Sequence, residues 1–318
     1  MYGEKIMKMT DLSFRKAKKN IATSTILSLS IFICVFLSPF ITEFTSNGLK
    51  LCANTVIGSV FPFLILTDVI VKFANFGAVS RLRAAFEKIF NINGYAITAF
   101  LIGLLCGFPL GVKVGVDLYK CGFISKDECE RLIGFSNNTG PAFVIAGVGY
   151  GLRGSARDGI ILYFCMLISA IISGYIIGIG KRSSSGYSSF RDNEAYDFTA
   201  SVKNAAANTL NICGFVVFFS VISGIVSIFV TNKTMYMLII SILEVSNATK
   251  ILSKGITTRL LSMPLSSLAI SFSGISVHMQ ARSFLCGTDL SMKRYWTTKA
   301  LQGILSFLIC FITILIIK

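Results

Sequence analysis

Apolar residues run along this 318-residue chain in long, nearly continuous blocks that short polar segments separate. One helical crossing of a bilayer core needs about 20 consecutive apolar residues, and several blocks reach that length. The pattern predicts an all-α polytopic membrane protein with about eight to ten spans, some of them interrupted or re-entrant half-helices. The predicted apolar segments are residues 21–41, 51–73, 94–119, 141–152, 159–180, 205–230, 235–243, 260–280 and 300–317.

Two interruptions fall inside the apolar stretch 101–152. Gly107, Pro109 and Gly111 weaken the helical hydrogen-bond ladder, because proline lacks an N–H and clashes with the preceding turn. A polar Ser-Asn-Asn-Thr-Gly sequence precedes Pro141 and opens the next apolar run. Freed backbone groups at membrane depth must pack against protein or line a cavity. The interruptions therefore predict broken helices whose ends face a substrate near the bilayer midplane.

The second half of the chain is interrupted in a similar way. The short run 235–243 stops at a Glu-Val-Ser-Asn sequence, and the run 260–280 contains Pro264 and a serine-rich stretch at 271–276. These interruptions predict further broken helices at corresponding positions, which is where a transporter with internal repeats holds its substrate.

Short matches between the two halves indicate a diverged duplication. Ala53-Asn54-Thr55 recurs as Ala207-Asn208-Thr209. Residues 107–113 match residues 274–280 in pattern, and a Cys-Gly pair follows each of these two segments, at 121–122 and at 286–287. The repeats are inverted if each contains an odd number of crossings. The predicted organisation is a basic N-terminus and first transmembrane helix at 1–50, a first repeat at 51–180, a polar linker at 181–204 and a second repeat at 205–318.

Composition and charge narrow the function classes. The chain is 53% hydrophobic and 14% charged, with a formal net charge of +15. Because Lys and Arg cluster at the N-terminus and between the apolar runs, their charge indicates a cytoplasmic N-terminus and contact with anionic headgroups of the lipid bilayer, and we expect no nucleic-acid partner. The nine cysteines show no CxxC or Cys/His spacing, so neither a disulfide framework nor a metal site is expected.

Residues for catalysis are missing from the sequence. With one histidine, no metal-ligand cluster, no GxSxG and no Walker sequence, we expect no catalytic residues, no cofactor and no enzyme activity.

Lys113 and Asp117 lie one turn apart within an otherwise apolar span, so they can pair on one helix face. Ionisable groups at membrane depth are costly and are candidates for function. Two interpretations stay open. Lys113 either neutralises Asp117 or reaches the interface, or it offers positive charge to an anionic substrate, helped by the N-terminus of a half-helix near Gly111.

Polar residues beside the other interruptions have two interpretations each. Asn137, Asn138 and Thr139 either cap the helix at Pro141 or present donors to a substrate. Glu244 is either a proton or cation site or a membrane-edge residue, and His278 is either a packing residue or a proton-coupling group. The predicted substrate-binding set is Gly107, Pro109, Gly111, Lys113, Asn137, Asn138, Thr139, Asn247, Ser273, Ser276 and Gln280, with Asp117, Glu244 and His278 as coupling candidates. Serines are also common at close helix contacts in membranes.

Three motifs in order resemble a known family. GFPLGVK at 107–113 with ISKDECERLIGFSNNTGPAFVIAGVGYG at 124–151, EVSN at 244–247 and SFSGISVHMQ at 271–280 resemble the sporulation integral membrane protein YlbJ family, also called SpoVV. That family is related to the nucleoside-recognition Gate domains, and the resemblance covers roughly residues 50–317. It implies a fold related to concentrative nucleoside transporters and a place in the mother-cell-derived outer forespore membrane.

The resemblance also implies a substrate. It predicts a sporulation-associated transporter that moves dipicolinic acid from the mother cell towards the forespore by alternating access. A nucleoside or other small-anion transporter is one alternative, and a non-transporting Gate-domain scaffold in spore assembly is another. The predicted partners are a small anionic substrate, the bilayer and other sporulation membrane proteins, and no oligomeric state is predicted.

Overall fold

The computed structural model describes residues 21–72, 80–183, 197–253 and 258–317, except for 22, 26, 30, 33 and 34. The described residues form helices and connecting turns and contain no strand, as the hydropathy pattern predicts. The basic stretch 1–20 and most of the predicted linker 181–204 lie outside the described residues.

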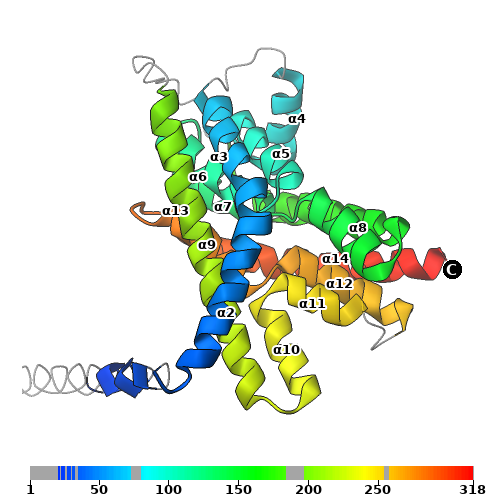
Figure 1. Ribbon diagram of the computed structural model, residues 1–318. Coiled ribbons are helices and arrows are strands. Elements are labelled where there is room, and N and C mark those ends of the chain that lie inside the picture. The colour runs from blue at the N-terminus through cyan, green and yellow to red at the C-terminus, as the bar shows by residue number, and fades with distance from the viewer. Residues whose placement is uncertain are drawn as a thin grey trace, which may run out of the picture.

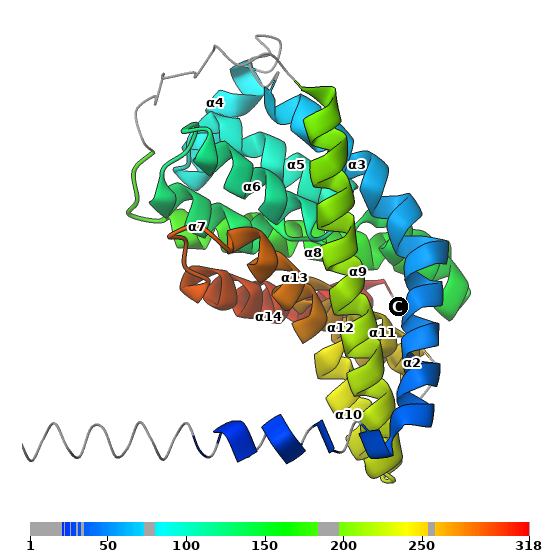
Figure 2. The same cartoon turned by 60° about the vertical axis from the view of Figure 1, so that its left-hand side comes forward.

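The first half contains α2 (Ser38–Leu51), η1 (Cys52–Val56), α3 (Ile57–Lys72), α4 (Ser80–Phe90), η3 (Gly94–Ala96), α5 (Ile97–Leu105), α6 (Leu110–Lys120), α7 (Lys126–Ser136), η4 (Ala142–Leu152) and α8 (Ala156–Gly178). The second half contains α9 (Phe198–Phe229), α10 (Lys233–Leu243), α11 (Val245–Ser253), α12 (Arg259–Phe272), α13 (Ile275–Leu285) and α14 (Lys293–Ile316). Figures 1 and 2 show these helices from two directions.

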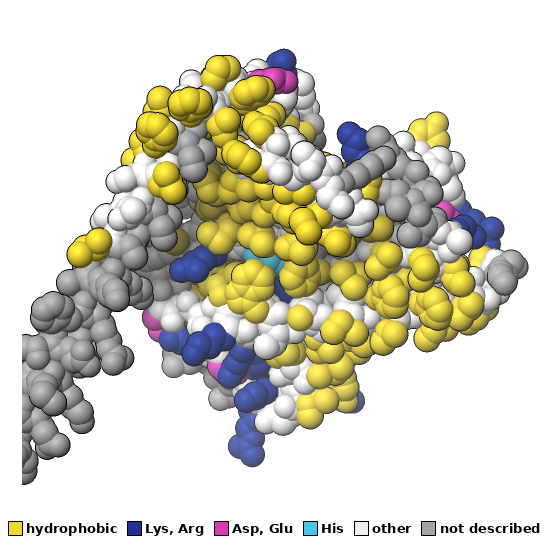
Figure 3. Space-filling view, turned by 90° about the horizontal axis from the view of Figure 1, so that it is seen from below, with side chains coloured by type: hydrophobic (Ala, Val, Ile, Leu, Met, Phe, Trp, Pro, Cys, Tyr) yellow, Lys and Arg dark blue, Asp and Glu magenta, His cyan; other side chains and the backbone are white. Residues whose placement is uncertain are grey.

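Long apolar helices confirm the polytopic membrane class. Four described helices are long and apolar enough to cross a bilayer: Ala156–Gly178, Phe198–Phe229, Arg259–Leu285 and Lys293–Ile316. A fifth crossing is formed if α4 and the segment Gly94–Leu105, which meet at 102°, count as one broken span. Shorter apolar helices lie at Val60–Ile70, Ala142–Leu152 and Thr234–Leu243. Apolar side chains cover much of the face in Figure 3, while Lys and Arg gather in clusters.

One boundary differs from the sequence prediction. The predicted spans 21–41 and 51–73 are not separated by a loop, because α2, η1 and α3 follow one another without a break from Ser38 to Lys72. The polar residues between 42 and 50 stay helical because that part packs against α9: the Ser220 hydroxyl donates to the Phe44 carbonyl at 3.1 Å and Gly48 lies against Val217. The continuous helical segment from Ser38 to Lys72 and the helix α9 therefore run side by side (Figures 1 and 2).

The predicted interruptions are breaks between helices. The chain turns between α5 and α6 at Gly107, which has φ 87°, and is non-helical between α7 and Pro141. It breaks again at Glu244 between α10 and α11, and at Ser273 and Gly274 between α12 and α13. Ser273 has φ 67° and ψ 171°, a region that costs a non-glycine residue about 1–3 kcal/mol. The predicted interruption at Pro264 is wrong, since α12 continues through that proline.

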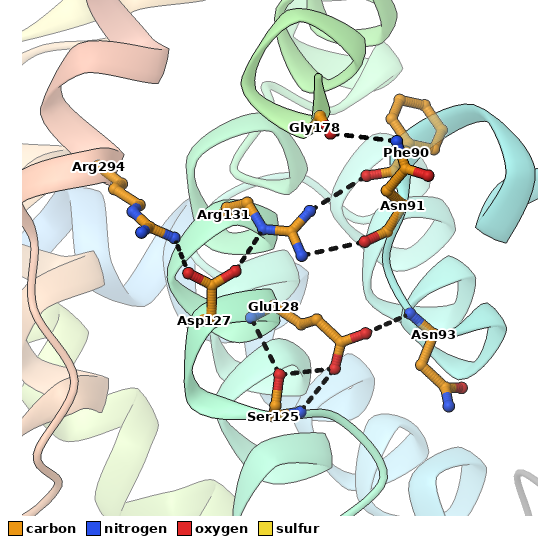
Figure 4. A network of polar contacts seen from close by, with 9 residues as sticks. All are labelled: Phe90, Asn91, Asn93, Ser125, Asp127, Glu128, Arg131, Gly178 and Arg294. Atoms are coloured by element: carbon orange, nitrogen blue, oxygen red, sulfur yellow. Dashed lines mark hydrogen bonds and ion pairs between the residues drawn. The ribbon is translucent and has the colours of Figure 1, made fainter. Parts of the chain in front are cut away.

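A polar network fixes the start of α7 (Figure 4). Ser125 and Glu128 form a capping box, and Glu128 also accepts the Asn93 N–H at 2.7 Å. Arg131 is buried, pairs with Asp127 at 2.9 Å and donates to the carbonyls of Phe90 and Asn91 at 3.2 and 3.0 Å. These bonds hold α7 against the loop after α4, and so determine where its C-terminal end at Ser136 lies.

The same network joins the two halves. Arg294 of α14 pairs with Asp127 of α7 (Figure 4). Burial alone would raise the pKa of Asp127, but the hydrogen bond from Arg294 and the charge of Arg131 hold that pKa below its usual value. Asp127 is therefore an anion over the neutral range and keeps both arginines paired.

Two glycines allow α5 and α6 to approach the end of α7. A Cβ added to Gly103 would lie 1.8 Å from the Ser136 carbonyl oxygen, and one added to Gly111 would lie 2.1 Å from the same atom. Both helices therefore contact the backbone at the break directly, and neither position has space for a side chain.

We expect Gly103→Ala to lower the free energy of unfolding by about 3 kcal/mol, because overpacking against backbone cannot relax. Thermal unfolding of the detergent-purified protein measures the effect. Gly58→Ala is the matched control, since a Cβ there meets nothing within 4 Å. Equal melting temperatures for the two variants would contradict the close packing.

Candidate functional site

The broken segments of the two halves meet. The Thr139 hydroxyl donates to the Ile270 carbonyl at 3.0 Å, which joins the break after α7 to the end of α12. Gly107 lies against Gly140, so the break between α5 and α6 packs behind the same segment. Gly274 lies against the backbone of Glu244. Backbone that leaves the helical ladder is thus gathered at one place, in contact with protein on several sides.

One part of the polar centre is a chain of three side chains. The Asn137 amide donates to the Tyr295 hydroxyl at 2.7 Å, and the same hydroxyl lies 2.8 Å from His278 Nδ1. All three residues are buried. The chain runs from the break after α7 through α14 to the first turn of α13, so it joins both halves.

The other part is built around Lys299, which is fully buried. Its ammonium donates to the Asn137 carbonyl at 2.8 Å and to Gln302 Oε1 at 2.9 Å. The Gln302 amide in turn donates to Asn138 Oδ1 at 2.7 Å. No ion pair of Lys299 with a carboxylate occurs in the described part of the chain. Holding a buried lysine charged beside only neutral partners is costly, and an ionisable residue at membrane depth is a candidate for a functional site.

Several atoms of this cluster have unused hydrogen-bonding capacity. Among the described residues, Ser136 Oγ, Asn137 Oδ1 and His278 Nε2 are buried without a hydrogen-bond partner. Unsatisfied buried polar atoms are uncommon in native proteins and point to a ligand, ion or water. We name the group Asn137, Asn138, His278, Tyr295, Lys299 and Gln302 the Lys299 cluster.

Lys113 lies in a different place. It pairs with Asp117 at 2.8 Å, as predicted from their spacing, and also with Asp68 of α3. Gly111 and Gly115 face α7, and Lys113, two residues from each, lies on the opposite side of α6. Two carboxylates share one ammonium, so this trio carries one net negative charge when all are ionised. The trio therefore gives no support to the interpretation that Lys113 binds an anion.

Other predicted residues also lie outside the Lys299 cluster. Gln280 donates to Ser276 at 3.4 Å within α13, on the side of that helix away from His278. Glu244 accepts the Asn247 N–H at 2.9 Å and so satisfies the first turn of α11. Ser273 donates to the Ile270 carbonyl at 3.4 Å. Pro109 lies at the start of α6.

Asn137, Asn138 and His278 of the Lys299 cluster belong to the predicted set, whereas Tyr295, Lys299 and Gln302 were absent from it. The sequence does carry a signal: Tyr295, Lys299, Gln302 and Ser306 recur at spacings of four, three and four residues, which places one polar stripe along α14. Ser306 extends the stripe by bonding to Ser267 at 2.6 Å and Ser271 at 2.7 Å of α12. A polar stripe in the middle of a membrane helix faces protein or a polar cavity.

The fold and the site define a polytopic α-helical membrane protein with a buried polar centre, built around Lys299, between its two halves. The chain is 24% identical over 304 aligned residues to the sporulation integral membrane protein YlbJ of Bacillus subtilis (strain 168), covering 82% of this chain and 74% of that protein. The similarity supports the resemblance to the YlbJ family that the motifs carry. No family model matches the chain, and no solved structure matches it.

Proposed function

We propose that the chain is a sporulation membrane transporter for a small dicarboxylate, with dipicolinate as substrate, moved from the mother cell towards the forespore. The name of the similar Bacillus subtilis protein supports a role in sporulation. The single observation that carries the choice of an anion is Lys299, a fully buried lysine whose hydrogen-bond partners are neutral, since an anion bound there would favour its ammonium form.

Charge favours an anion over a nucleoside. An uncharged nucleoside would leave the Lys299 ammonium uncompensated in a low-dielectric site, whereas a carboxylate would pair with it. Unused hydrogen-bonding atoms on Ser136, Asn137 and His278 could then meet the rest of a polar aromatic ligand. The N-terminus of α13 begins at Gly274 without a side-chain cap, and an uncapped helix start also favours negative charge.

The contacts in the centre suit alternating access. The bonds from Asn137, Asn138 and Thr139 to Tyr295, Gln302 and Ile270 all cross from the first half to the second. Rocking one half against the other would break these bonds, along with other contacts between the halves such as those of Lys299 with Asn137 and Arg294 with Asp127, and admit substrate.

On one side of the centre, the halves are also joined by polar contacts at the protein surface. Lys126 and Asp289 pair at 3.0 Å with side chains 48% and 62% exposed. Tyr119 donates to the same carboxylate at 2.8 Å. Because exposed pairs contribute about 0–1 kcal/mol each, these contacts would not prevent the halves from separating.

Uptake of labelled dipicolinate into proteoliposomes that contain the purified chain tests the proposal, with labelled uridine as the comparison. We expect dipicolinate to accumulate and uridine not to. Uridine uptake without dipicolinate uptake would assign a nucleoside carrier instead. Absence of both fluxes in sealed vesicles would contradict transport by this chain and favour a scaffold role in spore assembly.

A further inference from the structure

Two arginines share one buried carboxylate at the edge where α8 and α12 begin. Arg259 donates to Asp158 at 2.7 Å, and Arg153 approaches the same carboxylate at 3.4 Å. Asp158 is 7% exposed. We name Arg153, Asp158 and Arg259 the Arg153 cluster. Its two guanidinium groups and one carboxylate together carry one net positive charge.

Charge is not balanced by the surrounding elements. In η4 with Arg153 directly after it, and in α8, α11 and α12, which pack together here, Asp158 is the only acidic residue, whereas Arg153, Arg157, Lys250 and Arg259 are basic. The excess positive charge is therefore a property of this corner of the molecule, not of one side chain.

Arg153 has unused donor capacity. Its Nη2 donates to the Ser262 hydroxyl at 2.9 Å, but its Nη1 is buried without a partner among the described residues. The Arg153 side chain is 8% exposed and that of Arg259 is 49% exposed. One guanidinium is thus held in place by protein, while the other is open to a ligand from outside.

The location of Arg153 and Arg259 at the ends of apolar helices indicates which kind of ligand they bind. The apolar helix η4 ends at Leu152, and the membrane-spanning helices α8 and Arg259–Leu285 begin at Ala156 and Arg259. Their ends lie where hydrocarbon gives way to headgroups, which is where phosphate is concentrated. Guanidinium groups match phosphate oxygens in geometry and charge.

We propose that Arg153 and Arg259 together bind a phosphate group, carried by an anionic phospholipid headgroup or by a free phosphate. Arg259 meets the phosphate from the exposed side, and the unpartnered Nη1 of Arg153 supplies a second donor after a small movement of the ligand or side chain. Asp158 keeps the two guanidiniums side by side.

Native mass spectrometry of the detergent-purified chain with added phosphatidylglycerol tests the site. We expect Arg259→Gln and Arg153→Gln each to bind this lipid about tenfold more weakly, as loss of a charge-assisted hydrogen bond implies. Arg157→Gln is the matched control, because Arg157 is exposed, carries the same charge and lies in the first turn of α8, next to Asp158 in the sequence. Its binding should stay within about twofold of wild type, below the effect of losing one such bond.

Three further measurements decide the source and the specificity. Displacement of the lipid by inorganic phosphate supports a free phosphate as ligand, and failure to displace it supports the headgroup. Equal binding of phosphatidylcholine, or an equal loss in all three arginine variants, would overturn the proposal. If Arg153→Gln does not purify as a monodisperse protein, the half-exposed Arg259 still provides the test.

Discussion

Lys299→Gln is expected to lower dipicolinate uptake about 10- to 100-fold at low substrate concentration while leaving the protein as stable as the wild type or more stable. The substitution removes a fully buried charge whose partners are neutral, so folding no longer includes the desolvation of an unpaired ammonium. A glutamine amide can still donate to the Asn137 carbonyl. Binding of the anion loses a charge-assisted hydrogen bond, and we expect an affinity about 10- to 100-fold weaker.

Two measurements on the same preparation separate this result from misfolding. Thermal unfolding without substrate reports stability, and proteoliposome uptake reports flux. Lys293→Gln is the control, because Lys293 is exposed on the same helix and carries the same charge. Full uptake by Lys299→Gln would rule out an anion site at the Lys299 cluster, whereas a large loss of stability would show that the ammonium serves packing.

The fold class could be predicted from hydropathy because a bilayer imposes length and polarity on every span. The helix breaks at Gly107 and at 137–140 could also be predicted, since proline, glycine and a polar run weaken the ladder locally. Pro264 could not be judged in the same way, because a membrane helix can continue through a proline when its neighbours satisfy the freed carbonyl. Helix breaks were thus predicted correctly where several local signals coincide, and wrongly at Pro264.

The partners of the charged residues were harder to predict than the helix breaks. The pair of Lys113 and Asp117 follows from i,i+4 spacing, but Asp68 reaches Lys113 from another helix, 45 positions earlier, and no periodicity within one segment contains that contact. Lys299 stands immediately before the last predicted apolar run, 300–317, where the sequence favours an interfacial lysine. Only the packing of α14 against the end of α7 makes it buried.

Segments of the two halves that match in sequence also lie in helices that contact each other in the structure. The matched segments 53–55 and 207–209 lie in the two long helices that pack side by side, and the matched breaks 107–113 and 274–280 start α6 and α13, which contact each other. Gly122 and Gly287, which follow those helices, both have φ 77°. An inverted relation between the halves stays a prediction.

Lys113→Gln is expected to destabilise the protein by about 3 kcal/mol. Without the ammonium, Asp68 and Asp117 face each other with no cation between them, and breaking a buried ion pair on one side typically costs 3–5 kcal/mol. The lower end applies because the two carboxylate side chains are 18% and 28% exposed. The expected order of thermal stability follows net charge: the neutral Asp117→Asn variant is at least equal to wild type, and Lys113→Gln is lowest.

Thermal unfolding of Lys113→Gln, Asp117→Asn and the control Lys120→Gln measures that order; Lys120 is exposed on the same helix. Equal melting temperatures for Lys113→Gln and Lys120→Gln would contradict the trio as a structural unit. The outcome also determines how transport data are interpreted. Loss of flux in Lys113→Gln carries no information on an anion site when the fold itself is weakened, whereas loss of flux in a stable Asp117→Asn variant would assign the negative trio to coupling.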